Sequence, residues 1–145
     1  MRVRLAGRCH CGNLALIFET DLPPDQLPLR ECQCTFCRAH AAVNTSDPAG
    51  HVEIVAQDGG ELVRYLFGLR TAEFLICWCC GVYVAATCVV DGGLYATINV
   101  NVMNDRSPFS RAPEPTSNEG EDAAGRLARR KARWTPATLR IVTPK

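Results

Sequence analysis

Several short runs of the chain alternate hydrophobic and polar residues, which is the pattern of β-strands. "LALIF" (14–18) is a short apolar run, and "HVEIVA" (51–56) alternates apolar with polar residues. "QDGGE" supplies turn-forming glycines before "LVRYLF" (62–67), so we predict a hairpin between these two runs. Tyr65 and Phe67 share one face of the second run and are predicted to be core residues.

An uncharged run of seventeen residues, "FLICWCCGVYVAATCVV" (74–90), is at the lower limit of what can span a bilayer. It contains four cysteines and one glycine and is rich in Val and aromatic residues. This composition favours two buried strands joined by a metal-binding turn over a membrane helix. The formal net charge of +1 also gives no bulk electrostatic reason for binding nucleic acid or a membrane.

The remaining pattern predicts further strands and loops. "VDGGL" (90–94) is expected to turn one strand into the next, "LYATINV" (94–100). Residues 104–122 are rich in Pro, Ser, Asn, Asp and Glu, which predicts a long surface loop. A short helix is expected from about residue 121, and "TLRIV" (138–142) is expected to close the sheet.

A length of 145 residues suits one domain with a single core. We therefore predict a mainly β, antiparallel, single-domain fold over residues 1–145, with its core at about 3–105 and a loop and tail at 106–145. The first residues contain no apolar signal segment, so we expect a cytoplasmic protein. In that reducing compartment, clustered thiols are metal ligands more often than disulfides.

Nine cysteines are the outstanding feature of the composition, and their odd number argues against a simple disulfide framework. They form three groups and one single residue: Cys9 with Cys11; Cys32, Cys34 and Cys37; Cys77, Cys79 and Cys80; and Cys88 alone. Zinc binds thiolates tetrahedrally, and closely spaced pairs can supply two adjacent corners each. The grouping therefore predicts metal binding rather than nine buried apolar residues.

Two of these groups resemble the halves of one site. Gly12 and Gly81 each follow a cysteine pair, where a tight turn often requires a positive φ. We therefore predict one zinc site with four thiolate ligands and expect the extra thiol, Cys79, to point away from it. The predicted ligands are Cys9, Cys11, Cys77 and Cys80.

The middle group, in "ECQCTFCRAH" (31–40), has three cysteines and no obvious fourth ligand. Three protein ligands and one vacant position are typical of a catalytic or ligand-binding zinc. His40, three residues after Cys37, could instead close the site, and Cys79 or Cys88 folding across is a further alternative. His10 lies between two ligands and is expected to point away from the metal.

The motifs "GRCHCG", "CQCTFCR" and "YLFG…EFLICWCCG" together resemble the glutathione-dependent formaldehyde-activating enzyme family, which is grouped with centromere protein V. The resemblance covers residues from about 7 to 105, and "INVNVMND" and Trp134 fit the later part more loosely. Thr35 stands where the family usually has serine, and Cys79 is an additional thiol.

The resemblance implies a tent-like β fold with two Zn²⁺ sites, of which the second can be partly occupied. It implies a structural role for Cys9, Cys11, Cys77 and Cys80, and a catalytic role for Cys32, Cys34 and Cys37. The implied reaction is the condensation of glutathione with formaldehyde to S-hydroxymethylglutathione by a carbon–sulfur lyase.

The donor set of the middle group suits this chemistry. Three thiolates make zinc a weak Lewis acid, which is better at holding a soft substrate thiol than at generating hydroxide. Glutathione also carries two carboxylates, for which Arg38 is the nearest cation in sequence, while Arg30, Arg70 and Arg106 are weaker candidates. The alternative from a different class is a non-catalytic, zinc-stabilised binding module.

The C-terminal segment is basic, and four of its arginines share a helical face by spacing. We interpret this face as solvated, with a nucleic-acid patch as the alternative, because no interleaved aromatic residues support stacking on bases. The basic residues are Arg126, Arg129, Arg130, Lys131 and Arg133.

Overall fold

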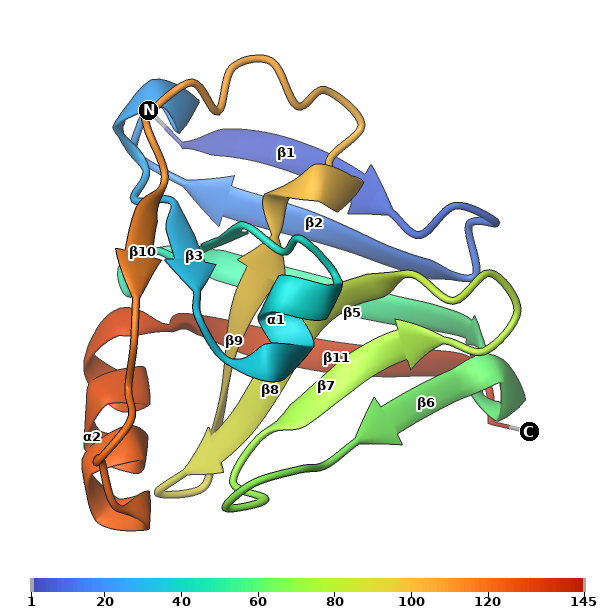
Figure 1. Cartoon of the computed structure of the whole chain (residues 1–145). Coiled ribbons are helices and arrows are strands. Elements are labelled where there is room, and N and C mark those ends of the chain that lie inside the picture. The colour runs from blue at the N-terminus through green and yellow to red at the C-terminus, as the bar shows by residue number, and fades with distance from the viewer. Residues whose placement is uncertain (1, 145) are drawn as a thin grey trace.

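The computed structural model describes residues 2–144 and shows a mainly β chain, as the sequence predicts (Figure 1). Within these residues, eleven strands share one sheet. The strands are β1 (Val3–Arg8), β2 (Leu14–Thr20), β3 (Arg30–Cys32), β4 (Asn44–Thr45), β5 (His51–Asp58), β6 (Leu62–Tyr65), β7 (Glu73–Cys77), β8 (Tyr83–Val90), β9 (Gly93–Asn99), β10 (Glu114–Thr116) and β11 (Thr135–Thr143). The helices are α1 (Thr35–Ala39) and α2 (Ala123–Arg133), with short 3₁₀ turns η1 (Pro24–Gln26), η2 (Gly59–Glu61) and η3 (Val100–Val102).

The sheet branches at β9. One path runs in the order β1-β2-β5-β11-β9-β4-β3-β10, and a second continues from β9 through β8 and β7 to β6. The pairings of β3 with β10 and of β5 with β11 are parallel, and the others are antiparallel. Helix α1 lies in front of β8 and β9 in Figure 1.

The run 74–90 forms strands β7 and β8 on either side of a cysteine-containing turn, which confirms the prediction of two buried strands. Strand β8 continues into β9 through the two-residue turn Asp91–Gly92, both with positive φ, as the sequence also predicts. Among residues 2–144, neither helix has the length and apolar composition needed to cross a membrane.

The predicted hairpin between 51–56 and 62–67 is wrong. Strand β5 pairs with β2 and β11, whereas β6 pairs with β7. Strand β5 is largely buried and has a neighbouring strand on each side, so no edge is free to pair with β6. The 3₁₀ turn η2 directs the chain away from β5. The predicted strand at 138–142 is part of β11, which joins the sheet between β5 and β9.

The core prediction for Tyr65 and Phe67 is also wrong. Tyr65 is 45% exposed, and Phe67 lies beyond the end of β6 and is partly buried. The apolar run that contains them lies at the end of the sheet branch, where β6 has a partner on one side only. The main core is instead built from the alternating inward residues of the longer strands, such as Leu14, Leu16 and Phe18 of β2.

A second apolar cluster connects the sheet with both helices. Cys37 of α1, Tyr83 and Cys88 of β8, and Trp134 after α2 are buried there, and Leu127 of α2 packs against them. Cys32 and Cys34 also pack against this cluster, so it holds both helices next to the group formed by Cys32, Cys34 and Cys37.

Candidate metal centres and the adjoining cavity

The first cysteine cluster brings together two turns that are far apart in the sequence. The Sγ atoms of Cys9, Cys11, Cys77 and Cys80 all lie within 4.8 Å of one another. Cys11 Sγ lies 3.7 Å from Cys9 Sγ and 3.5 Å from Cys77 Sγ. Metal–sulfur bonds of about 2.3 Å in a tetrahedron require sulfur–sulfur edges of about 3.8 Å. The four thiols therefore fit a closed, four-coordinate metal site.

Both turns have the same construction. Gly12 N–H donates to Cys9 O at 3.1 Å, and Gly81 N–H donates to Cys77 O at 2.8 Å. The φ angles of Gly12 and Gly81 are 89° and 80°, in the left-handed region that favours glycine. The reason for a glycine after each cysteine pair is therefore backbone geometry. Cys79, from the same segment, is exposed and lies outside the four-sulfur cluster.

The four thiols differ in how readily they ionise. Burial raises the pKa of Cys9 and, at Cys77, raises it to about 12. A backbone hydrogen bond involving Asn13 lowers the pKa of Cys11. Burial opposes the ionisation of Cys80, but hydrogen bonds from the backbone around it lower its pKa to about 6. Cys80 is therefore a thiolate at neutral pH, and a metal ion there can displace the protons of the other thiols.

Replacing Gly81 with alanine is expected to weaken metal binding at this cluster. None of the described atoms lies within 4 Å of a Cβ built at Gly81, so the cost comes only from the positive φ. That cost is about 1–2 kcal/mol, which corresponds to roughly a 5- to 30-fold loss of affinity. Competition with a chromophoric chelator measures this affinity.

Gly120 provides the matched control for this prediction. Its φ is 84° and a Cβ there also meets open space, but it lies in the loop before α2. Gly120→Ala should therefore lower stability without changing metal affinity. Equal metal affinity in Gly81→Ala and Gly120→Ala would contradict the role assigned to the turn.

The second cluster contains Cys32 at the end of β3, Cys34 before α1 and Cys37 within α1. Their Sγ atoms lie within 4.8 Å of one another. Cys34 is the N-cap of α1, and its Sγ accepts a hydrogen bond from Cys37 N–H at 3.3 Å. The hydrogen bond from Cys37 N–H to Cys34 Sγ caps this five-residue helix. The helical turn between the two residues brings the Sγ atoms of Cys34 and Cys37 to the same side of the chain.

A buried polar chain holds the third sulfur of this cluster. Tyr83 Oη donates to Asn44 Oδ1 at 3.2 Å, which orients the Asn44 amide so that Nδ2 donates to Cys37 Sγ at 3.9 Å. Asn99 Nδ2 in turn donates to the Tyr83 carbonyl at 3.0 Å. Burial raises the pKa of Tyr83 well above its usual value, so the phenol keeps its proton.

The three thiols share one negative charge unequally. Hydrogen bonds from the thiols of Cys32 and Cys37 lower the pKa of Cys34 to about 2. The contact with Cys34 raises the pKa of Cys32, and contacts with Cys32 and then Cys34 raise the pKa of Cys37. A thiolate is therefore present in this cluster at neutral pH before any metal binds.

Within residues 2–144, no fourth side chain joins this cluster. His40 is exposed, and its ring packs on Phe36 with 4.5 Å between ring centroids. Cys88 is buried, and its Sγ donates to the Thr71 carbonyl at 3.1 Å. The alternatives in which His40, Cys79 or Cys88 completes the site are therefore not realised in this structure.

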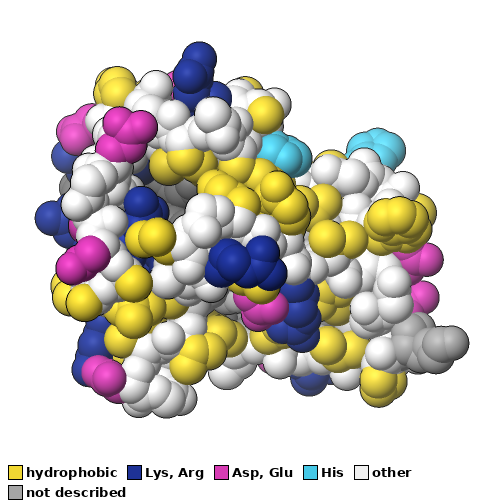
Figure 2. Space-filling view, turned by 60° about the horizontal axis from the view of Figure 1, so that its bottom comes forward, with side chains coloured by type: hydrophobic (Ala, Val, Ile, Leu, Met, Phe, Trp, Pro, Cys, Tyr) yellow, Lys and Arg dark blue, Asp and Glu magenta, His cyan; other side chains and the backbone are white. Residues whose placement is uncertain are grey.

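The three cysteines open onto a cavity of about 520 Å³. Its apolar wall includes Phe67, Phe74 and Tyr83. The remaining wall is rich in arginine, and the arginines that line it are Arg30, Arg38, Arg126, Arg129, Arg130 and Arg133. On the face turned forward in Figure 2, hydrophobic patches lie beside groups of Lys and Arg side chains, with Asp and Glu side chains among them. The volume is in the range of small-molecule sites, about 300–1,000 Å³.

The structure separates the arginine candidates. Arg38 is exposed and lines the cavity, as does the partly buried Arg30. Arg70 is exposed and does not line it, and Arg106 is committed to Asn101 Oδ1 and the Phe109 carbonyl. The four arginines of α2, which the spacing placed on one helical face, all line the cavity. Arg130 is buried there, Arg126 and Arg129 are partly buried, and Arg133 is exposed. Interpreting that face as solvated was therefore wrong for the buried Arg130, although Arg133 is exposed, because a helix's spacing does not reveal which side packs against the sheet.

The comparisons with known proteins agree with the fold. No family model matches the chain, and no curated protein matches it. The chain is similar to the crystal structure of a Rhodobacter sphaeroides protein, a structural-genomics target, with 25% sequence identity and a TM-score of 0.59. That similarity covers 77% of this chain and 100% of the other. The arrangement of strands therefore recurs in a solved protein whose description names no activity.

Proposed function

We propose that this chain is a zinc-dependent carbon–sulfur lyase that adds a glutathione-like thiol to a small aldehyde such as formaldehyde, or catalyses the reverse reaction. The observation that carries the proposal is the difference between the two cysteine clusters. One cluster has four thiols, whereas the other has three and borders a cavity. Closed four-ligand sites are typical of structural zinc, and three-ligand sites of catalytic zinc.

The resemblance to the glutathione-dependent formaldehyde-activating enzymes supports the choice of thiol and aldehyde. A donor set made only of thiolates favours zinc over magnesium, calcium or manganese, which prefer oxygen ligands. In this proposal Cys9, Cys11, Cys77 and Cys80 hold the structural ion, and Cys32, Cys34 and Cys37 hold the second ion.

Cys32, Cys34 and Cys37 would hold the zinc ion, and when bound it would supply Lewis-acid activation of a soft substrate thiol by lowering the pKa of that thiol. In the reaction a carbon–sulfur bond forms, the π bond of the aldehyde breaks, and the thiol proton passes to the aldehyde oxygen. The chain's own residues hold the geometry. Asn44 and Tyr83 orient Cys37, while Phe67 and Phe74 provide an apolar wall that limits water.

Isotope-exchange NMR tests this proposal. Zinc-loaded protein, ¹³C-formaldehyde and glutathione are mixed, and the exchange rate between formaldehyde and S-hydroxymethylglutathione is measured. We expect the protein to accelerate exchange by at least about tenfold over the uncatalysed reaction, since a positioned thiolate replaces a bimolecular encounter.

Cys79→Ser is the matched control for this assay, because Cys79 is an exposed cysteine of the same fold that lies outside both clusters. It should accelerate exchange as the unmodified protein does. A non-catalytic binding module predicts no acceleration even when both clusters are filled with zinc, and that result would refute the lyase.

A further inference from the structure

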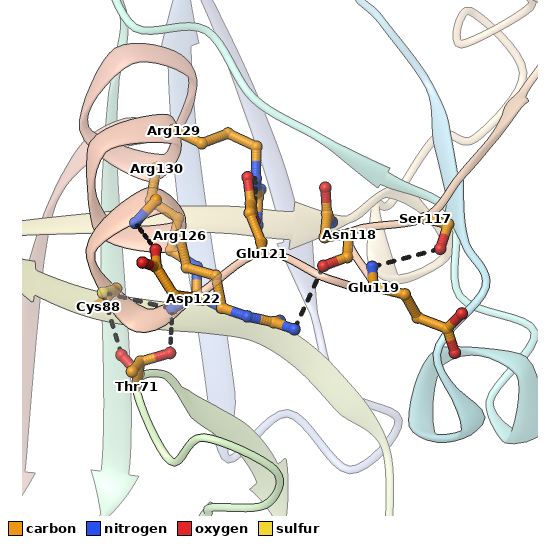
Figure 3. A network of polar contacts seen from close by, with 11 residues as sticks. Thr71, Cys88, Ser117, Asn118, Glu119, Glu121, Asp122, Arg126, Arg129 and Arg130 are labelled. Carbon is orange, nitrogen blue, oxygen red and sulfur yellow. Dashed lines mark hydrogen bonds and ion pairs between the residues drawn. The ribbon is translucent and has the colours of Figure 1, made fainter.

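The inward face of α2 forms an arginine-rich wall at the cavity, which we call the arginine wall. It consists of Arg126, Arg129, Arg130 and Arg133 together with Arg30 of β3. In Figure 3 the side chains of Arg126, Arg129 and Arg130 extend from the helix beside Thr71, Cys88 and the segment 117–119. Strand β3 also contains Cys32, so the wall and the three-cysteine cluster share one element and one cavity.

Arg130 is the anchor of this wall. It is 95% buried, at 5% exposure, and its Nη1 donates to Thr71 Oγ1 at 2.7 Å and to Cys88 Sγ at 3.7 Å. Its guanidinium lies 4.9 Å from the centre of the Trp134 ring. Its Nε is buried and has no hydrogen-bond partner among the described residues. A buried guanidinium that retains a free donor and has no carboxylate beside it is costly unless a ligand supplies the acceptor.

The neighbouring arginines are only partly satisfied. Arg126 Nη2 donates to the Asn118 carbonyl at 3.4 Å, and its buried Nε also has no partner within residues 2–144. Arg129 Nε contacts both carboxylate oxygens of Glu121 at 3.1 Å. Arg30 Nη1 donates to the neutral Ser46 hydroxyl at 2.9 Å. Among the described residues, Arg129 is the one arginine of the wall that forms an ion pair with a carboxylate.

The charges of the wall are therefore unbalanced. Beside its five guanidinium groups, Glu119 lines the cavity, Glu121 pairs with Arg129, and the negative charge of Glu114 acts on Arg30. Burial lowers the pKa of Arg30, and the positive charges of Arg133 and Arg129 lower it further. Burial likewise lowers the pKa of Arg130, with repulsion from Arg129 and Arg126 in addition. An oxyanion placed among these groups would relieve this repulsion and accept the unused hydrogen bonds.

We propose that the arginine wall is an anion-binding subsite, which holds the carboxylate or phosphate end of an acidic thiol whose sulfur lies at Cys32, Cys34 and Cys37. Placing the oxyanion on the thiol itself rests on the proposed function, whereas anion binding by the wall does not. Arginine suits this task because its planar donor fork matches the geometry of carboxylates and phosphates. The subsite therefore selects acidic thiols over neutral thiols of similar size.

Anion binding is tested first without any reactive thiol. S-methylglutathione keeps the two carboxylates but cannot offer a thiol, and inorganic phosphate tests the wall with an anion alone. Titration calorimetry measures binding, and the fluorescence of Trp134 reports on the wall in a Trp78→Phe background, since Trp78 is the other tryptophan and is 72% exposed. We expect Arg126→Gln and Arg133→Gln each to weaken binding by roughly tenfold or more, the effect of losing one charge-assisted hydrogen bond.

Arg140→Gln is the matched control, because Arg140 lies on β11 and pairs only loosely, at 3.9 Å, with Glu53. It should bind both anions as the unmodified protein does. Arg133 is exposed, so its variant keeps the test decisive if Arg126→Gln folds poorly. Failure of both anions to bind, or equal binding by the wall variants and Arg140→Gln, overturns the subsite.

The second arm asks whether the anion belongs to the thiol. In cobalt-substituted protein, absorption bands report sulfur binding at the metal, and glutathione is compared with 2-mercaptoethanol. We expect Arg126→Gln to weaken the binding of glutathione by roughly tenfold and to leave the binding of 2-mercaptoethanol unchanged. An equal loss for both thiols, or none for either, overturns this assignment. A protein that binds anions through the wall but accelerates no exchange refutes the lyase and leaves the subsite standing.

Discussion

Replacing Cys77 with serine is expected to prevent stable folding at physiological temperature. Cys77 is fully buried in the core and supplies one of the four sulfur atoms that join the two turns. Structural zinc contributes about 10–16 kcal/mol of binding free energy, which is comparable with the whole stability of a domain, about 5–15 kcal/mol. Even a loss of about 3 kcal/mol would lower the melting temperature by roughly 6–12 °C. Thermal unfolding followed by circular dichroism measures the change.

Cys79→Ser is the control, because Cys79 is two residues away but exposed and outside the cluster. This variant should melt within about 2 °C of the unmodified protein, as surface substitutions usually change stability by no more than about 0.5 kcal/mol. If Cys77→Ser and Cys79→Ser melted alike with the metal present, the four-cysteine cluster would not be what stabilises the fold.

Replacing Cys34 with serine is expected to abolish metal binding and thiol exchange at the three-cysteine cluster and to leave the four-cysteine cluster intact. Cys34 is half-buried at the cavity and caps α1, and its variant should lose one metal equivalent while the four-cysteine cluster keeps the other. Removing a residue that merely supports a ligand costs about 10–100-fold in affinity or activity, so losing the ligand itself should reduce thiol exchange by at least about 100-fold. Metal analysis and isotope-exchange NMR on the same sample measure both effects.

Thermal unfolding distinguishes this result from simple misfolding. The Cys34→Ser variant should melt cooperatively, since the main core and the four-cysteine cluster are untouched. One bound metal with full retained activity would exclude the three-cysteine cluster from the chemistry. Loss of both metals would show instead that the two clusters depend on one another.

The sequence pattern predicted much of this structure for local reasons. The apolar run 14–18 became part of β2, the alternating run 51–56 became part of β5, and the uncharged run became β7 and β8, because these patterns act within a few positions. The cysteine spacings predicted two clusters because neighbouring ligands in a knuckle are close in sequence. Gly12 and Gly81 marked the turns, since few other residues adopt their positive φ without strain.

Other features depended on contacts between distant segments. Strand β5 pairs with β2 and β11 rather than with the next strand, and that choice was not visible in the runs themselves. Helix α1 was missed because five residues carry too little periodicity to be recognised, and its cap is a thiol rather than a usual capping side chain. A clue was present in the C-x-C-x-x-C spacing, which needs a turn of helix to bring Cys34 and Cys37 together.

By itself, the sequence determined the mainly β character, the grouping of the cysteines and the existence of a basic helical face, all of which follow from spacing along the chain. Only the tertiary structure decided that His40 packs on Phe36 instead of joining the cysteines, and that the arginines of α2 face a cavity. The physical reason is that periodicity identifies the faces of an element but not what each face meets. That partner is chosen by packing across the whole sheet, where burial of apolar surface outweighs local preference.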